Sequence, residues 1–346
     1  MKYKNVLVTG GCGFIGSNFI HYLYEKNDCI SVVNLDCLSY AGNKDNLCGI
    51  SENNSYFFYE GSINDEQLVN KVLKKHNIQC IVNFAAESHV DKSISDPHNF
   101  INTNILGTYN LINSFNKYIK DQKFDCLFLH VSTDEVFGSL KKEDPPFTEN
   151  NNYKPNSPYS ASKASSDLLV KAWNKTYNFP AIITNCSNNY GPYQYPEKLI
   201  PLTIYNAING NNINIYGDGS NIRDWLFVRD HCSGIYKVIN SGKVGETYNI
   251  GGNNELDNNQ LINLICQILD ELIPAGNNQN TKFKKYSELI RYVPDRPGHD
   301  FRYSINSNKL ASDLNWSPNT DLLIGLKMTV QWYLDNQNWM IKSLKK

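Results

Sequence analysis

The sequence lacks the features that mark several classes of protein. Its formal net charge is only -1 at pH 7 and no strongly basic stretch stands out, so we expect neither a nucleic-acid-binding nor an anionic-membrane-binding surface. No apolar run approaches the roughly 18 residues that a membrane span needs, and the apolar run near the N-terminus is too short for a signal peptide. We therefore predict a cytoplasmic protein.

The nine cysteines also lack a pattern, since none of them forms a Cys-x-x-Cys pair and their number is odd. This predicts reduced thiols and no metal site. There is no internal repeat and no low-complexity linker. A length of 346 residues, with 41% apolar and 19% charged residues, is typical of a globular chain with one large or two modest domains.

A glycine-rich segment follows the first apolar run. Residues 5–9 (NVLVT) lead into Gly10-Gly11-Cys12-Gly13-Phe14-Ile15-Gly16, after which apolar residues recur at helical spacing. Glycines between a strand and a helix allow a tight turn and bring the helix N-terminus close to a pyrophosphate. A second strand, residues 30–35, ends at Asp36, which could accept from both ribose hydroxyls and would repel a 2′-phosphate. We therefore predict NAD, although Asp36 could also be a plain turn residue.

Strands and helices alternate through the first half of the chain. Further strands are expected at residues 56–61, 80–86, 126–131 and 181–185, and helices at 65–76, 104–118 and 159–177. This alternation predicts an α/β fold with a doubly wound parallel sheet of the Rossmann type. Beyond Gly191 the alternation weakens, leaving a strand and turn over 247–255 and helices from about Leu199 and over 322–335. We predict an NAD-binding domain over 1–188, to which roughly 226–252 return, and a smaller interleaved substrate-binding lobe over 189–346.

Two fragments carry candidate chemistry. Ser132-Thr133-Asp134-Glu135 follows a buried strand, and ligands bind at that edge of an open α/β sheet. Tyr159 and Lys163 would share one face of a helix. The lysine would then lower the pKa of the tyrosine below about 10 and make it a base. Alone, such a pair is usually a helix surface, and two adjacent acids are usually a solvated turn.

Together these motifs resemble the extended short-chain dehydrogenase/reductase superfamily. Within it, residues 132–138 (STDEVFG) are similar to the nucleoside-diphosphate-glucose 4,6-dehydratases, most of all to the members that act on dTDP-glucose. Further matches span nearly the whole chain and lie at residues 40–43 (YAGN), 87–91 (ESHVD), 188–192 (NNYGP), 196–201 (PEKLIP), 222–225 (IRDW) and 296–300 (RPGHD).

The resemblance implies a lyase (hydro-lyase) that uses NAD in deoxysugar (rhamnose-type) biosynthesis. Tyr159 would take the proton of the C4 hydroxyl, helped by Thr133, while NAD takes the C4 hydride and later returns it to C6. Glu135 would remove the C5 proton, and a protonated Asp134 would donate to the departing C6 hydroxyl, because different environments can separate the pKa values of two acids. The product would be the 4-keto-6-deoxy sugar nucleotide and water.

The resemblance also implies further binding residues and a homodimer. The cofactor would be bound by Gly10, Gly13, Phe14, Ile15, Gly16, Asp36, Ser39, Ser62, Ile63, Ala85, Ala86, Tyr159 and Lys163. The nucleotide sugar would be bound by Ser88, Asn188, Glu197, Lys198, Leu199, Tyr216, Arg223, Asn258, Arg296 and His299, with the two arginines facing the diphosphate. Dimerisation would use the helices near 104–118 and 160–177.

Several alternatives stay open. Ser62 stands where the family usually has an aspartate that reaches the adenine, and Lys92 stands where it usually has an arginine. A sugar-nucleotide 4-epimerase or decarboxylase of the same superfamily would need Thr133, Tyr159 and Lys163 but not the acid pair. A non-catalytic NAD-binding regulator should have lost part of that set. UDP-glucose remains possible beside dTDP-glucose, Arg223 could pair with Asp224, and His299 could cap a loop.

Overall fold

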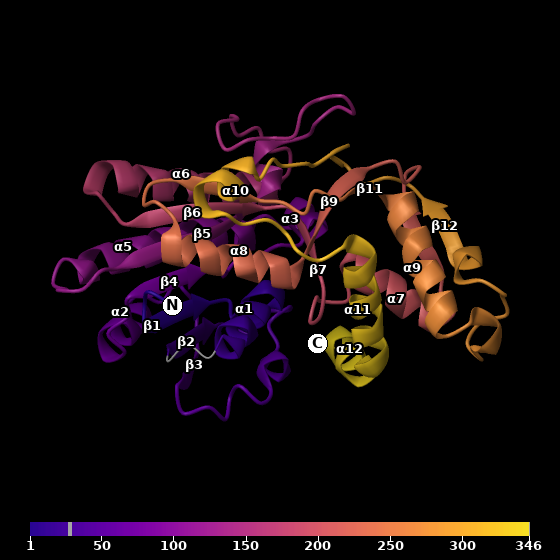
Figure 1. The fold of residues 1–346 in the computed structure, drawn as a ribbon, viewed down its shortest axis with the longest axis horizontal. Coiled ribbons are helices and arrows are strands. Elements are labelled where there is room, and N and C mark those ends of the chain that lie inside the picture. The colour runs from indigo at the N-terminus through magenta and orange to yellow at the C-terminus, as the bar shows by residue number, and fades with distance from the viewer. Residues whose placement is uncertain (27–29, 346) are drawn as a thin grey trace.

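The computed structural model describes residues 1–26 and 30–345 and is built around a seven-stranded parallel sheet (Figure 1). The strand order is β10-β6-β5-β4-β1-β2-β3. These strands are β1 (Asn5–Thr9), β2 (Ser31–Asp36), β3 (Tyr56–Glu60), β4 (Cys80–Asn83), β5 (Leu127–Thr133), β6 (Ala181–Cys186) and β10 (Thr247–Ile250). The order reverses between β1 and β4, which opens a crevice at the carboxyl ends of the strands. The predicted doubly wound sheet is confirmed.

Helices cover both faces of this sheet. One apolar core lies between the sheet and α1 (Phe14–Glu25), α8 (Val228–Ser241) and α10 (Asn308–Leu314). A second core lies under α2 (Glu66–Lys75), α5 (Thr108–Ile119) and α6 (Pro158–Tyr177). Val6 and Val8 join the first core and Leu7 joins the second, because successive side chains of a strand point to opposite faces. Covered faces explain why the middle of several strands is a continuous apolar run, as in Val6–Val8 and Leu127–Leu129.

A smaller lobe adjoins the carboxyl edge of the sheet (Figure 1). Its apolar core is separate from those of the sheet. The lobe contains β7 (Asn188–Tyr190), α7 (Leu199–Ile208), β8 (Ile213–Tyr216), β9 (Ile222–Phe227), β11 (Glu255–Asp257), α9 (Asn258–Leu272), β12 (Ile290–Val293), α11 (Leu322–Asp335) and α12 (Gln337–Leu344). Between these segments α8 and β10 return to the main sheet, so the lobe is interleaved. The domain limit between residues 188 and 189 stays a prediction.

Three predicted boundaries were wrong. β4 ends at Asn83, so Ala85 and Ala86 follow the strand instead of belonging to it. β5 continues to Thr133, because its last residues still pair with β6. The helix expected from residue 104 begins with a π-helical turn, Ile101–Gly107, preceded by α3 (Val90–Ser95) and α4 (His98–Phe100).

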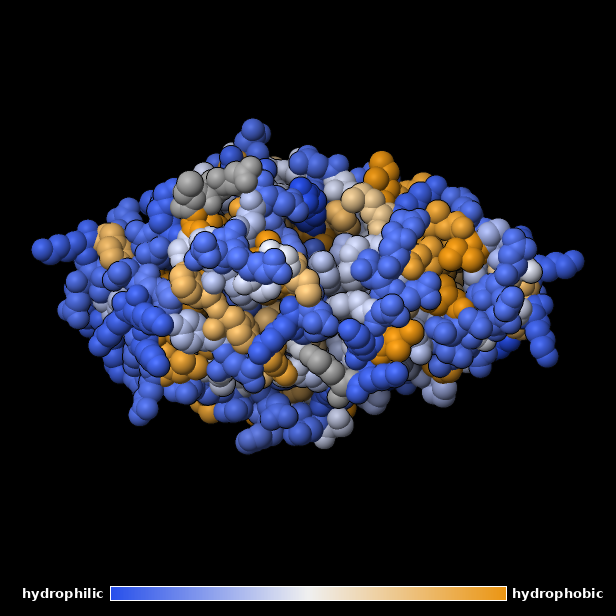
Figure 2. Space-filling model, turned by 90° about the horizontal axis from the view of Figure 1, so that it is seen from below, coloured by the Kyte–Doolittle hydropathy of each residue, from blue (hydrophilic) through white to orange (hydrophobic). Residues whose placement is uncertain are grey.

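The surface is mixed in polarity, and the described cysteines form no disulfide. On the face shown in Figure 2, apolar residues form separate groups among hydrophilic ones. Within the described part of the chain, no helix is long and apolar enough to cross a membrane. Cys29 lies outside the described residues, and the other eight cysteines are free thiols.

Candidate active site

A cavity of about 320 Å³ lies at the carboxyl edge of the sheet. Its walls come from the β1–α1 turn, the ends of β2, β4 and β5, the start of α6 and the segment before α7. All the predicted catalytic and cofactor-binding residues line it: Gly10, Gly13, Phe14, Ile15, Gly16, Asp36, Ser39, Ser62, Ile63, Ala85, Ala86, Thr133, Asp134, Glu135, Tyr159 and Lys163.

The glycine-rich turn leaves no room for side chains. Gly10 has a φ of +68°, and a Cβ there would lie 2.8 Å from the amide nitrogen of Ala85. A Cβ on Gly16 would lie 2.3 Å from the carbonyl oxygen of Gly10. α1 starts after Gly13 with neither a side-chain cap nor an acid in its first turn. The helix N-terminus therefore suits a diphosphate, which would receive backbone N–H groups and the positive end of the helix dipole.

Asp36, the last residue of β2, also lines the cavity. Its carboxylate accepts from the backbone N–H of Cys12 at 2.8 Å and from that of Leu38 at 2.7 Å. These bonds hold the buried side chain at the end of β2 while it still lines the cavity. The arrangement fits the adenosine ribose of NAD, whose hydroxyls could donate to the remaining lone pairs.

The paired acids start one short helical turn, Asp134–Phe137, directly after β5. Thr133 Oγ1 donates to Asp134 Oδ1 at 3.2 Å and accepts from the backbone N–H of Glu135 at 3.3 Å. Asp134 is only 2% exposed, and its Oδ2 has no hydrogen-bond partner. Thr133 therefore holds both acids at the floor of the cavity.

The two acids differ in their electrostatic surroundings. Burial raises the pKa of Asp134 well above its usual value, and the Glu135 carboxyl raises it further. Burial also raises the pKa of Glu135, but the positive charges of Arg223, Arg296 and Lys198 oppose that rise. Asp134 is therefore the acid that keeps its proton, and Glu135 is the one that can be ionised.

Tyr159 and Lys163 lie in the first turns of α6, whose start is fixed by its N-terminal cap. Ser157 and Ser160 form a capping box, with Pro158 in the first turn. Lys163 is 4% exposed, and its Nζ donates to the carbonyl oxygen of Val131 at 2.8 Å. The helix therefore fixes both side chains against the end of β5.

The expected lowering of the Tyr159 pKa by Lys163 was wrong. Burial raises the pKa of Tyr159 well above its usual value, and the Glu135 carboxyl adds to the rise, while a hydrogen bond with Thr133 offsets part of it. The lysine ammonium donates a hydrogen bond to the carbonyl oxygen of Val131, and its charge does not outweigh the effects that raise the Tyr159 pKa. Burial and the neighbouring acid could not be deduced from the spacing of the pair alone.

Four of the ten predicted substrate-binding residues line the cavity: Ser88, Asn188, Glu197 and Lys198. Lys198 Nζ donates to the carbonyl oxygen of Ser88 at 3.0 Å, and Glu197 contacts His89 Nε2 at 3.3 Å. These contacts join the segment before α7 to the segment after β4. Polar groups from the lobe and from the sheet therefore meet at the cavity.

The other six do not line the cavity: Leu199, Tyr216, Arg223, Asn258, Arg296 and His299. Arg223 donates to the carbonyl oxygens of Ile222 at 2.7 Å and Asp300 at 2.9 Å, which uses much of its guanidinium. Arg296 forms an ion pair with Asp91 at 3.2 Å, and its Nε is buried without a partner. His299 bonds Asp295 at 2.7 Å. The substrate-binding roles of these residues stay predictions.

Tyr40 was not predicted as a site residue, whereas Ser62 and Lys92 were noted as departures from the family pattern. Tyr40 lines the cavity and donates to Glu197 at 2.9 Å, and the matching segment at residues 40–43 was a usable signal for it. Ser62 lines the cavity, where its Oγ accepts from the backbone N–H of Asn64 at 3.1 Å. The Lys92 ammonium lies 3.6 Å from the centre of the Tyr40 ring, so this departure from the family pattern still contacts the cavity wall.

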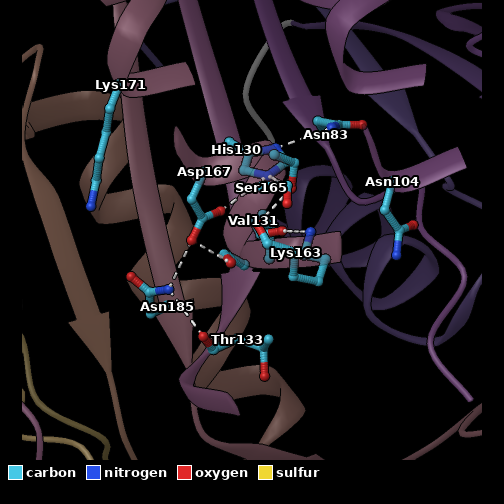
Figure 3. Close-up of polar contacts among 12 residues, drawn as sticks. Asn83, Asn104, His130, Val131, Thr133, Lys163, Ser165, Asp167, Lys171 and Asn185 are labelled. Atoms are coloured by element: carbon cyan, nitrogen blue, oxygen red, sulfur yellow. Dashed lines mark hydrogen bonds and ion pairs between the residues drawn. The ribbon is translucent and has the colours of Figure 1, made fainter. Parts of the chain in front are cut away.

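Buried polar residues lie next to Thr133 and Lys163 (Figure 3). Asp167, on α6, accepts from Ser132 Oγ at 2.8 Å and from the Tyr153 hydroxyl at 3.0 Å. Asn185 donates to the carbonyl oxygen of Thr133 at 3.0 Å and to Asp167 at 3.5 Å. Asp167, Tyr153 and Asn185 were not predicted as site residues, although Asp167 follows Lys163 by one helical turn.

Known proteins share both the sequence and the fold. A family model described as GDP-mannose 4,6 dehydratase matches residues 7–329. The dTDP-glucose 4,6-dehydratase of Shigella flexneri is 48% identical over 347 residues, which cover 97% of this chain and 94% of the relative. The Bacillus anthracis dTDP-glucose 4,6-dehydratase, solved in complex with NAD, is 45% identical with a TM-score of 0.86, covering 98% of this chain and 99% of that chain.

A different enzyme of the same fold is also similar. The UDP-glucose 4-epimerase of Thermotoga maritima, solved with UDP-glucose, is 28% identical with a TM-score of 0.83. The match covers 96% of this chain and 99% of that chain. Fold alone therefore does not separate dehydration from epimerisation, and the side chains of the cavity have to decide.

Proposed function

The chain belongs to the dTDP-glucose 4,6-dehydratase family, and from this premise we propose how its cavity removes water from a nucleoside-diphosphate glucose. It is a hydro-lyase that uses NAD and works in nucleotide-sugar metabolism. The reaction oxidises C4, eliminates water across C5 and C6, and returns the hydride to C6. Its products are a 4-keto-6-deoxy sugar nucleotide and water.

The adjacent acids of the cavity wall, Asp134 buried and Glu135 partly buried, are the observation that carries this proposal. Asp134 and Glu135 share the cavity wall with Thr133, Tyr159 and Lys163. A 4-epimerase needs no acid and base for elimination, so this pair would have no task in one. Placing one buried carboxyl beside a second, partly buried one is costly, and such an arrangement persists where a reaction uses it. The pair therefore favours dehydration over epimerisation.

We assign the roles of the two acids from their electrostatics, and those of Tyr159 and Lys163 from their place in the cavity beside Thr133. NAD, when bound, accepts the C4 hydride and gives it back to C6. Tyr159, hydrogen-bonded to Thr133, takes the proton of the C4 hydroxyl, and Lys163 supplies the positive charge on the same face of α6. The new ketone acidifies the C5 proton, which Glu135 removes. Asp134, which keeps its proton at neutral pH, donates that proton to the departing C6 hydroxyl.

For the sugar nucleotide, we propose that Arg296 and Lys198 recognise its charged part. Arg296 carries a buried Nε without a partner, and its positive charge acts on Glu135. Lys198 lines the cavity beside Ser88 and Glu197. Arg223, whose donors already bond to carbonyl oxygens, contributes its charge more than new hydrogen bonds.

We also propose a homodimer in the cytoplasm. On α5 and α6, Tyr109 is 43%, Leu168 57% and Tyr177 55% exposed, which is high for large apolar side chains on adjacent helices. Paired with a second copy, these helices would form a four-helix contact. Buried thiols such as Cys80 and Cys186 pack like small apolar residues, as they do in a reducing compartment.

A parallel assay tests the function and the nucleotide. Purified protein is incubated with dTDP-glucose or with UDP-glucose, without added reductant, and the product is followed by mass spectrometry and by its alkaline absorbance. We expect loss of one water from dTDP-glucose. A product of unchanged mass and galactose configuration would instead establish an epimerase, and dehydration of UDP-glucose alone would overturn the choice of nucleotide.

A further inference from the structure

The carboxyl group of Asp167 is buried behind the catalytic residues and has no role in the reaction as described. The side chain is 0% exposed and follows Lys163 by one turn on the inner face of α6. Figure 3 shows it between His130, Lys163 and Asn185. An ionised carboxyl in such a place costs free energy unless other groups stabilise it.

Hydrogen-bond donors converge on one oxygen of this carboxyl. Ser132 Oγ donates to Oδ2 at 2.8 Å, the Tyr153 hydroxyl at 3.0 Å and Asn185 Nδ2 at 3.5 Å. The other oxygen lies 3.3 Å from His130 Nε2. An acceptor facing so many donors is best satisfied as a carboxylate.

The charges around Asp167 identify its partner. Burial lowers the pKa of His130, and the charge of Lys163 lowers it further, so the imidazole is neutral. The remaining ionisable neighbours are Lys163 on α6, Cys186 on β6, Tyr153 in the loop before α6, and Lys171, whose Nζ donates to the Tyr153 hydroxyl at 2.9 Å. Lys163 is therefore the buried cation that balances the carboxylate.

We propose that Asp167 is a positioning residue, the counter-ion that keeps Lys163 charged and that fixes the end of β5 carrying Thr133. The first effect acts through space, since the lysine ammonium bonds to Val131. The second runs through Ser132 on β5 and through Asn185, which bonds both Asp167 and the carbonyl oxygen of Thr133. The proposal rests on the proposed function only in one respect, namely that Lys163 supplies positive charge beside Tyr159 during the reaction.

Burial and Asp167 act on Lys163 in opposite directions. Burial lowers the pKa of Lys163, and the negative charge of Asp167 opposes that fall. For Asp167 itself, burial alone would raise the pKa, but the close contact with His130, the charge of Lys163 and the hydrogen bond from Ser132 hold that pKa below its usual value. Removing the negative charge should therefore let Lys163 lose its proton at a lower pH.

The test measures the titration of Lys163 directly. The protein is prepared with ¹³C-labelled lysine, and the Lys163 ¹³Cε resonance is assigned by its loss in Lys163→Met. In Asp167→Asn, which keeps the shape of the side chain, the midpoint should fall by at least about one pH unit relative to the parent. Tyr153→Phe removes one hydrogen bond but keeps the charge, so its midpoint should match the parent. An unchanged midpoint in Asp167→Asn would overturn the proposal.

Turnover provides a second readout. If the dehydration proposal holds, the alkaline limb of the pH profile of kcat should move to lower pH in Asp167→Asn by the same amount, while a merely structural defect would lower kcat equally at every pH. If the dehydration proposal fails, the titration of Lys163 still decides. If Asp167→Asn does not fold, ¹³C-labelled aspartate in the parent decides instead: a carboxylate ionised at neutral pH is expected, and a neutral Asp167 would overturn the proposal.

Discussion

At the scale of single residues, the cavity separates two neighbouring acids. Asp134 has one oxygen bound by Thr133 and one with no partner, whereas Glu135 feels the charges of Arg223, Arg296 and Lys198. Two carboxyl groups in the same helical turn can therefore act one as an acid and the other as a base. The cost is a buried, incompletely satisfied carboxyl.

That cost predicts a stability change in Asp134→Asn. The folded pKa of Asp134 lies well above its usual value, so the folded state binds the proton more tightly and stability falls as pH rises from about 4 toward the folded pKa. The amide removes this loss, so the variant should be more stable at neutral pH by about 1–3 kcal/mol, and the gain should vanish near pH ~4. Urea unfolding at both pH values measures it. The exposed Asp313→Asn is the control, and a loss of stability in Asp134→Asn at neutral pH would contradict the assignment.

Tyr159→Phe tests the first step. Without the hydroxyl no group takes the C4 proton, so oxidation and dehydration should both fall by about 10³-fold. The absorbance of the reduced cofactor after mixing with the sugar nucleotide reports oxidation separately from product. Tyr292→Phe, at a side chain 62% exposed on the lobe, should behave as the parent. Near-parental oxidation in Tyr159→Phe would assign the base elsewhere.

At the scale of elements, the β1–α1 turn shows how closely local sequence fixes local geometry. Gly10 and Gly16 lie where a Cβ would press on backbone atoms of Ala85 and Gly10. Backbone atoms cannot move aside as a flexible side chain can, so these positions exclude even alanine. Because these glycines carry no side chains, the backbone N–H groups at the start of α1 stay accessible to a diphosphate.

Gly16→Ala should therefore lose stability and cofactor together. We expect a loss of about 2–4 kcal/mol in urea unfolding, and NAD should dissociate during purification. Gly276→Ala is the matched control, because a Cβ there meets nothing within 4 Å, and it should stay within about 0.5 kcal/mol of the parent. A stable Gly16→Ala that retains NAD would show that the turn can relax.

Elements also differ in how far sequence predicts them. Sequence predicts β1, α1 and β2 well. Their signals are the apolar run at residues 5–9, the glycines that follow it and the position of Asp36 after the second strand. β8 and β12 were not predicted, because each has only four residues and is partly buried, so neither gives a clear apolar pattern in the sequence. Asp167 escapes because its partners Ser132 and Asn185 lie on separate strands, which only the packing of α6 on the sheet brings together.

At the scale of the whole molecule, the lobe and the sheet close one cavity between them. Lys198 reaches the carbonyl oxygen of Ser88, Tyr40 reaches Glu197, and Arg296 reaches Asp91. Each contact joins the lobe to the segments after β2 or β4. The proposed catalytic residues lie at the end of β5, in the short helical turn after it and at the start of α6, so the part of the lobe in the proposed function is to bind the substrate.

The proposed dimer predicts a change of mass at this scale. Leu168→Glu places a charge on the α5–α6 face and should convert the dimer to a monomer in sedimentation velocity. Ile324→Glu is a matched control, because Ile324 on α11 is 58% exposed, close to the 57% of Leu168, and it should leave the dimer intact. A monomeric parent, or a dimeric Leu168→Glu, would exclude this interface.

Elimination by the acid pair is the central claim, and a single-turnover experiment with Glu135→Gln tests it most directly. The parent and the variant are each mixed with dTDP-glucose while cofactor reduction and loss of water are followed. Because C4 oxidation does not need Glu135, the absorbance of the reduced cofactor should rise and persist in the variant, and water loss should slow by about 10²–10³-fold. Water loss at the parental rate would contradict the assignment of Glu135 as the base.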